Sequence, residues 1–358
     1  MRSLALGCAL LFSSLSFAQS TQATSALNET SRSEIIDAVL KALNDNYVFP
    51  KVAKKMEAAV REKAKSGRYD QQTDGRRLTD LLQSDLRDIC QDKHLTIHYS
   101  DTPMPMQHEE AAPETDDPNA PPLDQWAQRL RRQNWGFRKV EILDGNIGYL
   151  DLRAFAPVNK ESSQVAAGAM SFLASSDALI VDLRQNGGGA PAMVAFLTTY
   201  LFGEEPVHLN SLEEPRRGTS HQWWTLPIVP GLRFGPDKPV FILTSRFTFS
   251  AAEEYSYNLL NLERATLIGE TTGGGAHPVE SVIVHPHVSV GLPFARAVNP
   301  ISGTNWEGTG VEPHISIDAN DALGEAHLNA LDGLIDAAGD SPERDALLQV
   351  AKRLESSF

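Results

Sequence analysis

Short apolar runs alternate with amphipathic segments across the middle of this chain, and this alternation limits the possible folds more than any other feature. The run Ala178–Val181, apolar throughout, is typical of a strand that is buried on both faces of a sheet. Strands that alternate with helices form a mainly parallel sheet covered by helices, so the sequence predicts an α/β layered core. The predicted strands span 137–143, 147–155, 178–183, 239–244 and 265–269, and the predicted helices span 161–174, 190–202 and 251–262.

Segments of different character flank this core. Amphipathic helices begin at Ser31, which forms a capping box with Glu34, and we expect Pro50 and Gly67 to end the first and the second of them. Asp, Glu and Pro dominate residues 100–123, which is typical of an exposed linker. The predicted organisation is a signal peptide at 1–18, an N-terminal helical domain at 31–99 that forms a small bundle of three helices, an acidic Pro-rich linker at 100–124, the α/β core at 125–318 and C-terminal helices at 319–358.

Residues 1–18 have the composition of a secretory signal peptide. Arg2 gives a positive start, Leu4–Phe12 is an apolar core, and Ser16 and Ala18 are small residues at the two positions that a signal peptidase reads. Cleavage after Ala18 would export the protein to the periplasm or the extracellular space. Because no run reaches the roughly 18 apolar residues of a membrane helix, membrane insertion is not expected.

Charge and cysteine content restrict the partners. The net charge of −14 argues against a nucleic-acid partner, because phosphate binding needs clustered Lys and Arg. Without the signal peptide, Cys90 is the one remaining cysteine, so no disulfide can form within the chain, and we interpret Cys90 as a small buried hydrophobic residue. No motif requires a metal or an organic cofactor, and none specifies an oligomeric state.

Asp182–Gly189 is the first of three segments whose residue types suit catalysis or binding. It ends in three glycines directly after a strand, which frees backbone amides to point into a cavity. Gly187, Gly189 and Ala192 imitate part of a dinucleotide-binding motif, but the segment follows a later strand and a second half of that motif is not apparent. A tight turn without a ligand is the alternative interpretation.

The second segment, Thr248–Glu254, contains a serine where a strand turns into a helix. At that place the free amides and the dipole of the helix stabilise a developing anion, which suits Ser250 as a nucleophile. The alternative is that Ser250 only caps the helix, with Glu253 completing a capping box.

The third segment, Asp92–Tyr99, has the alternation of a strand, with His94 and His98 on its polar face. The two histidines are too far apart along an extended strand to clamp one metal ion easily, and no carboxylate or cysteine cluster completes a zinc site. Taken alone, they are polar-face residues.

Together with Ile268–Gly275 and Gly310–Pro313, the segments Asp182–Gly189 and Thr248–Glu254 resemble the C-terminal-processing (tail-specific) serine peptidase family. The resemblance extends from about residue 31 to 318 and is strongest to the branch that contains interphotoreceptor retinoid-binding protein and the tricorn core. It implies a ClpP/crotonase-like α/β core.

The resemblance also implies a set of site residues. Many family members pair the serine with a lysine in the glycine-rich segment, but Gly273–Gly275 has glycine at that position, so a Ser-Lys dyad is not supported. The tricorn-like arrangement implies Ser250 as nucleophile, His94 as general base and Glu307 as the carboxylate that orients it. In that arrangement a serine precedes the histidine, whereas this chain has Lys93.

Four further residues complete the predicted site. The amides of Gly188 and Ala251 are expected to form the oxyanion hole. His277 is a competing base that we place at the rim of the cleft, together with Asn186.

The leading hypothesis is an exported serine endopeptidase that hydrolyses peptide bonds in peptides or unfolded proteins through an acyl-enzyme. A non-catalytic protein that binds hydrophobic ligands on the same fold is the second hypothesis. An interaction scaffold that uses the acidic linker is the third.

Overall fold

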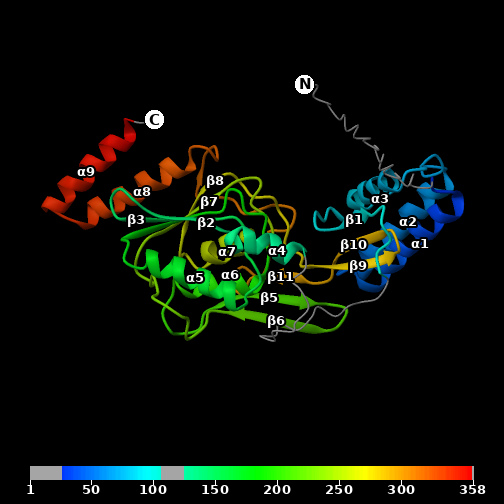
Figure 1. Ribbon diagram of the computed structural model, residues 1–358, viewed down its shortest axis with the longest axis horizontal. Coiled ribbons are helices and arrows are strands. Elements are labelled where there is room, and N and C mark those ends of the chain that lie inside the picture. Colours follow the sequence, from blue (N-terminus) through cyan, green and yellow to red (C-terminus); the bar gives the residue numbers. More distant parts are fainter. Residues whose placement is uncertain (1–25, 106–124, 357–358) are drawn as a thin grey trace, which may run out of the picture.

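A computed structural model describes residues 26–105 and 125–356. The predicted signal peptide and most of the predicted acidic linker lie outside the described residues. At the centre of the core is a six-stranded sheet in the order β12-β8-β7-β4-β3-β2 (Figure 1). Its strands are β2 (Phe137–Leu143), β3 (Ile147–Leu152), β4 (Ala178–Asp182), β7 (Val240–Thr244), β8 (Thr266–Gly269) and β12 (Ile315–Ser316).

Five of these strands are parallel, and β2 runs antiparallel to β3 at one edge. An apolar cluster lies on each face of the sheet. Alternate side chains of β4 point to opposite faces, so Leu179 and Val181 belong to the first cluster and Ala178 and Ile180 to the second. The first cluster includes residues of α4 (Gln125–Arg132), α5 (Lys160–Leu173), α6 (Pro191–Thr199) and α7 (Ala251–Asn261), and the second includes residues of α8 (Ala322–Ala337) and α9 (Pro342–Glu355).

The predicted α/β layered core with N-terminal helices is therefore confirmed, and each predicted core strand and helix is present. The ends differ by a few residues. The strand predicted to reach 155 ends at Leu152, and the helix predicted to reach 202 ends at Thr199. A short 3-10 turn, Asn134–Gly136, precedes β2, and an antiparallel sheet of β11 (Arg296–Val298), β5 (His208–Glu214) and β6 (Thr219–Trp224) adjoins the core.

The N-terminal helices do not pack as a separate bundle. α1 (Glu29–Asn46), α2 (Pro50–Lys65) and α3 (Gly75–Cys90) pack on the sheet β1-β10-β9, formed by β1 (Thr96–Tyr99), β10 (Val288–Pro293) and β9 (Val279–His285). Two of these strands come from residues 279–293, within the segment that the sequence assigned to the core. The N-terminal unit, as we call these helices and strands, thus contains a hairpin that extends from the core (Figure 1).

The first two helices differ in detail from the prediction. Asn28, not Ser31, caps α1, and its side-chain oxygen accepts a 2.8 Å hydrogen bond from Ser31 N. α1 already ends at Asn46, and Pro50 begins α2 instead of ending α1. Proline is favoured at the first position of a helix because the N–H that it lacks has no intrahelical partner there. Gly67 follows α2 in the left-handed region, as expected.

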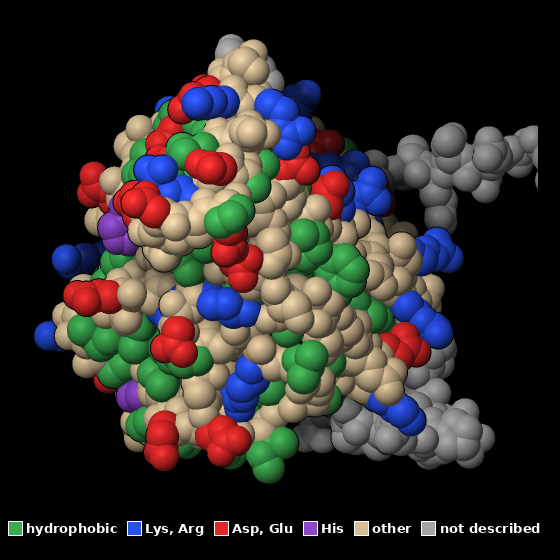
Figure 2. Space-filling model, turned by 90° about the vertical axis from the view of Figure 1, so that its left-hand side faces the viewer, with side chains coloured by type: hydrophobic (Ala, Val, Ile, Leu, Met, Phe, Trp, Pro, Cys, Tyr) green, Lys and Arg blue, Asp and Glu red, His purple; other side chains and the backbone are tan. Residues whose placement is uncertain are grey.

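Acidic and basic side chains are mixed on the face of the core that carries α8 and α9 (Figure 2). No patch of a single sign is visible on that face. Among the helices of the described residues, none has both the length and the apolar character that crossing a membrane requires.

α3 leads directly to Asp92 and His94, and a buried charge holds it in place. The carboxylate of Asp85 is fully buried and accepts hydrogen bonds from Lys63 Nζ (2.7 Å), Arg68 Nε (2.6 Å) and Tyr69 OH (2.8 Å). Burial raises the pKa of the Asp85 carboxyl, but the hydrogen bonds from Arg68, Lys63 and Tyr69 outweigh it and leave the pKa below its usual range.

We therefore expect Asp85→Asn to lower the free energy of unfolding by about 2 kcal/mol, because the amide cannot satisfy three donors that faced a carboxylate. Asp80→Asn is the matched control, since Asp80 is exposed on the same helix. Urea unfolding of both variants measures the difference. Equal stability of the two variants would contradict a structural role for Asp85.

Candidate active site

Ser250 lies between β7 and α7 in an unfavourable backbone conformation. Its φ is +55°, in the left-handed region that residues other than glycine rarely adopt. Its N–H donates a 2.8 Å hydrogen bond to Glu253 Oε2, which is one half of the predicted capping box. Strain of this kind persists only where surrounding contacts impose it, and it is frequent at functional serines on strand-to-helix turns.

Glu253 is one of those contacts, and the sequence assigned it no role beyond capping. Its buried carboxylate also accepts hydrogen bonds from Thr272 Oγ1 (2.5 Å), Gly274 N (2.6 Å) and Gly275 N (2.9 Å). Burial raises the pKa of this carboxyl, and the four hydrogen bonds oppose that effect. Glu253 therefore fixes the glycine-rich segment Gly273–Gly275 against the start of α7.

The glycines after β4 pass directly against the nucleophile turn. A Cβ on Gly188, whose φ is +108°, would lie 2.7 Å from Ser250 Cβ. A Cβ on Gly189 would lie 2.0 Å from the carbonyl oxygen of Phe155. Only glycine allows the backbone to approach this closely.

Asn186 is fully buried and does not lie at the rim of a cleft, where we expected it. Its Nδ2 donates to Leu152 O (3.0 Å), and its Oδ1 accepts a 2.9 Å hydrogen bond from Gly188 N. The amide of Gly188, predicted as an oxyanion donor, is thus already bonded. Ala251 N belongs to the first turn of α7, whose amides have no intrahelical acceptor.

His94 lies beside the residue that precedes Ser250. Its ring packs on the ring of Phe249 with a centroid distance of 4.6 Å. Its Nδ1 is buried and has no hydrogen-bond partner among the described residues. Burial lowers the pKa of His94 to about 4, so the imidazole is neutral at physiological pH. No hydrogen bond joins His94 to Ser250 within the described part of the chain.

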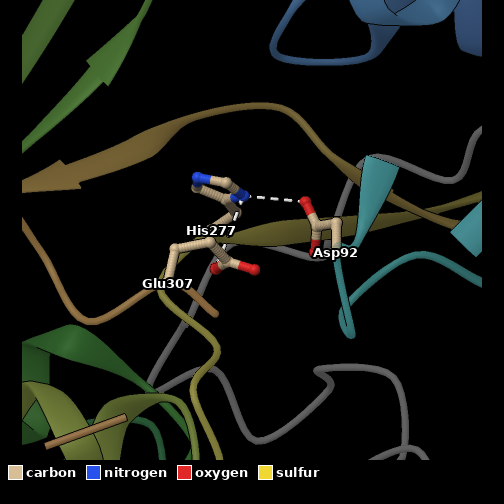
Figure 3. Close-up of side chains that lie close together, drawn as sticks. All are labelled: Asp92, His277 and Glu307. Carbon is tan, nitrogen blue, oxygen red and sulfur yellow. Dashed lines mark hydrogen bonds and ion pairs between the residues drawn. The ribbon is translucent and has the colours of Figure 1, made fainter. Parts of the chain in front are cut away.

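His277 is buried as well, although we expected it at the rim of the cleft. Its Nδ1 lies 2.7 Å from Asp92 Oδ2 and 3.5 Å from Glu307 Oε2 (Figure 3). Glu307 Oε2 accepts a 2.5 Å hydrogen bond from Ala276 N, while Oε1 is buried without a partner in the described residues. Burial raises the pKa of the Glu307 carboxyl. Glu307 therefore contacts His277, and not His94 as the resemblance implied.

Asp92, His277 and Glu307 also carry the atom types that bind metal ions, within 4.8 Å of one another. The 2.7 Å contact of His277 Nδ1 with Asp92 Oδ2 is a hydrogen-bond distance. Two ligands of a tetrahedral zinc ion with bonds near 2 Å would be about 3.3 Å apart. A shared proton fits this contact better than an ion does.

Lys93 occupies the position where the resemblance implied a serine. Its Nζ donates a 2.5 Å hydrogen bond to Gly273 O, in the segment that Glu253 holds. His98, which lies in β1, is exposed. Lys93 therefore adds a contact between the N-terminal unit and the core.

A cavity of about 750 Å³ lies at the carboxyl ends of β4, β7 and β8. Arg184, Gln185, Arg246 and Glu270 are among its lining residues, together with the exposed ring of Phe247. None of Ser250, His94 and Glu307 is among its lining residues, so this polar cavity lies apart from the predicted catalytic residues.

A strained serine between a parallel strand and a helix, beside a glycine-rich turn and a neutral imidazole, is typical of hydrolases that use a serine nucleophile. The comparison with known families is more specific. The model of peptidase family S41 matches residues 146–317, and the model of the N-terminal domain of Peptidase_S41 in eukaryotic IRBP matches residues 21–134. The chain belongs to peptidase family S41.

Solved structures share the fold at low sequence identity. A lipoprotein from Streptococcus agalactiae is similar with a TM-score of 0.55 and 15% identity, over 84% of this chain and 96% of that chain. A candidate peptidase from Parabacteroides merdae has a TM-score of 0.54 and 18% identity, over 86% and 98%. The tricorn protease has a TM-score of 0.50 and 16% identity, over 91% of this chain and 37% of that chain.

Because Gly275 has no side chain, the imidazole of His94 can pack directly against its backbone. A Cβ on Gly275 would lie 2.6 Å from His94 Cε1 and 2.3 Å from Phe249 Cζ. We expect Gly275→Ala to push the imidazole off the Phe249 ring into water, which raises the pKa of His94 from about 4 toward the ordinary value near 6.5. Histidine NMR titration measures this shift.

Gly168→Ala is the control, because a Cβ there meets nothing within 4 Å. A pKa of His94 that stays near 4 in Gly275→Ala would show that the ring does not depend on this space.

Proposed function

We propose that this protein is a serine endopeptidase that hydrolyses peptide bonds in peptides or unfolded proteins through an acyl-enzyme at Ser250. The observation that carries the proposal is the left-handed φ of Ser250 at the start of α7, imposed beside Gly188 and Glu253. Membership of peptidase family S41 supplies the reaction class. The sequence of residues 1–18 supports export as part of the proposal.

His94 is the general base in this proposal. A serine hydroxyl is a weak nucleophile at neutral pH and needs an acceptor for its proton. His94 packs on Phe249, next to Ser250, and its Nδ1 is the buried nitrogen, so Nε2 is the atom left to face the hydroxyl. His277 is the weaker candidate, since its Nδ1 already contacts Asp92 and Glu307.

Glu307 is the proposed carboxylate behind the base. Both His94 Nδ1 and Glu307 Oε1 are buried without partners among the described residues. Both side chains lie against the segment Gly275–Ala276, since a Cβ on Gly275 would meet His94 and Ala276 N donates to Glu307. A hydrogen bond from Nδ1–H to Oε1 would satisfy both atoms, fix the tautomer and stabilise the imidazolium.

Two backbone amides are proposed to bind the oxyanion. Ala251 N stays in this role because it begins α7. Gly189 N replaces Gly188 N, which donates to Asn186. The backbone of Phe155 pairs with this segment through two hydrogen bonds, from Phe155 N to Gly188 O and from Ala190 N to Phe155 O. This pairing does not use the amide of Gly189. Each donor of this type contributes about 3 kcal/mol to transition-state stabilisation.

Covalent labelling tests the nucleophile. We expect a fluorophosphonate probe to modify the wild-type protein at Ser250 with loss of fluoride, and Ser250→Ala to abolish both labelling and cleavage of an unfolded protein. Ser256→Ala is the matched control, because Ser256 lies on the same helix and its hydroxyl is bonded to Ala252 O. Cleavage that persists in Ser250→Ala would remove this residue from the mechanism.

The pH dependence of labelling tests the base. The labelling rate follows the fraction of neutral His94, and the pKa of this buried imidazole is about 4. The rate should therefore stay constant as the pH falls from 7 to about 5, and should decrease around pH 4 as the imidazole takes up a proton. His94→Gln should lose most of the labelling rate, and the remaining rate should no longer decrease around pH 4. A labelling rate that already decreases between pH 7 and pH 6, the range of an ordinary histidine, would contradict the buried base.

A further inference from the structure

The proposed base and nucleophile come from different parts of the molecule. His94 belongs to the N-terminal unit, at the entry to β1, whereas Ser250 belongs to the core. A catalytic pair of this kind is useful only where something fixes one part against the other, because a displacement of 1 Å can cost about 100-fold in rate.

Asp92 connects the backbone of the base to the core. Its Oδ1 accepts a 2.9 Å hydrogen bond from His94 N, two residues along the chain. Its Oδ2 accepts from Tyr47 OH (3.2 Å) and contacts His277 Nδ1 at 2.7 Å. Asp92 is 1% exposed, so water does not compete for these bonds.

His277 is itself fixed from several sides. Its ring meets the ring of Phe49 edge-on with a centroid distance of 5.3 Å, and Glu307 Oε2 lies 3.5 Å from its Nδ1. It follows Gly275, whose amide donates to Glu253 Oε2. Ser250 N donates to the same oxygen.

A continuous series of short contacts thus leads from the nucleophile to the base. It passes from Ser250 N to the Glu253 carboxylate, through the backbone from Gly275 to His277, and on to the Asp92 carboxylate and His94 N. None of these links involves the imidazole of His94, which stays free for proton transfer.

We propose that Asp92 is the positioning residue of the base, and that its buried contact with His277 locks the His94 segment of the N-terminal unit to the core in register with Ser250. The proposal rests on the proposed function, since it assigns Asp92 and His277 to the assembly of that site. Neither residue touches the reacting atoms.

A double-mutant cycle tests the pair. The variants are Asp92→Ala, His277→Phe and the two combined, with His277→Asn as the conservative variant whose amide can still donate to Asp92. We expect each single substitution to lower the rate of fluorophosphonate labelling by about 100-fold, and the double variant to be no slower than either, because all three lose the same contact. His277→Asn should recover part of the rate.

Two further readouts separate positioning from loss of folding. The concentration dependence of labelling should show a lower maximal rate with an unchanged half-saturating concentration of the probe, because the probe still binds to a core that is intact. Asp88→Asn makes the same change of charge at an exposed position of α3 and should label like the wild type. Urea unfolding of each variant identifies any that does not fold.

NMR of the histidine side chains tests the positioning without reference to catalysis. The His94 resonance, assigned by its loss in His94→Gln, should titrate near pH 4 in the wild type and in Asp88→Asn. In Asp92→Ala and His277→Phe it should move toward the ordinary pKa near 6.5, because the ring leaves its buried place on Phe249. Asp92→Ala is the decisive variant, since loss of the Asp92 charge by itself lowers the pKa of His94, whereas loss of His277 by itself raises it.

Failure of the wild type to label would overturn the proposed function, and the titration would still decide whether Asp92 positions His94. A His94 pKa that stays near 4 in folded Asp92→Ala and His277→Phe would overturn the positioning role. Labelling losses that multiply in the double variant would overturn it as well.

Discussion

The buried carboxylate of Glu253 is the interaction on which the site depends. It accepts hydrogen bonds from Ser250 N, Thr272 Oγ1 and the amides of Gly274 and Gly275, which belong to two segments separated by α7 and β8. A buried carboxylate is tolerated only where donors surround it. The segments that supply these donors therefore cannot separate without leaving an unsolvated charge, so the turn at Ser250 and the glycine-rich segment are fixed together.

That segment explains which kind of proton acceptor this chain can use. Because Glu253 holds its backbone, Gly275 cannot withdraw from the rings of His94 and Phe249, and a Cβ at this position would overlap both. Any side chain at 275, a lysine included, would have to occupy the place of the imidazole. A lysine at position 275 would therefore compete with the imidazole of His94 for the same space, and the glycine at this position agrees with a histidine in the site.

The sequence predicts the layers of the fold and the place of the nucleophile, because both depend on local patterns. A run such as Ala178–Val181 is apolar on both faces, and Ser250 follows a strand and opens a helix. The pairing of β1 with β10 leaves no local pattern, because it joins segments far apart along the chain. The same limit explains the errors at Asn186 and His277, since their burial depends on partners from distant strands and loops that residue type alone does not reveal.

Glu307 contacts the imidazole of His277, although the proposed site needs its carboxylate beside His94. A carboxylate has two oxygens, however, and only Oε2 is used, by Ala276 N and His277. Oε1 has no partner within the described residues, and neither has His94 Nδ1. An unsatisfied buried acceptor and an unsatisfied buried donor each cost about 1–3 kcal/mol. A hydrogen bond between them would recover that energy and leave the contact of Oε2 with His277 in place, so in the proposed site one carboxylate holds the anchor of the N-terminal unit and orients the base at the same time.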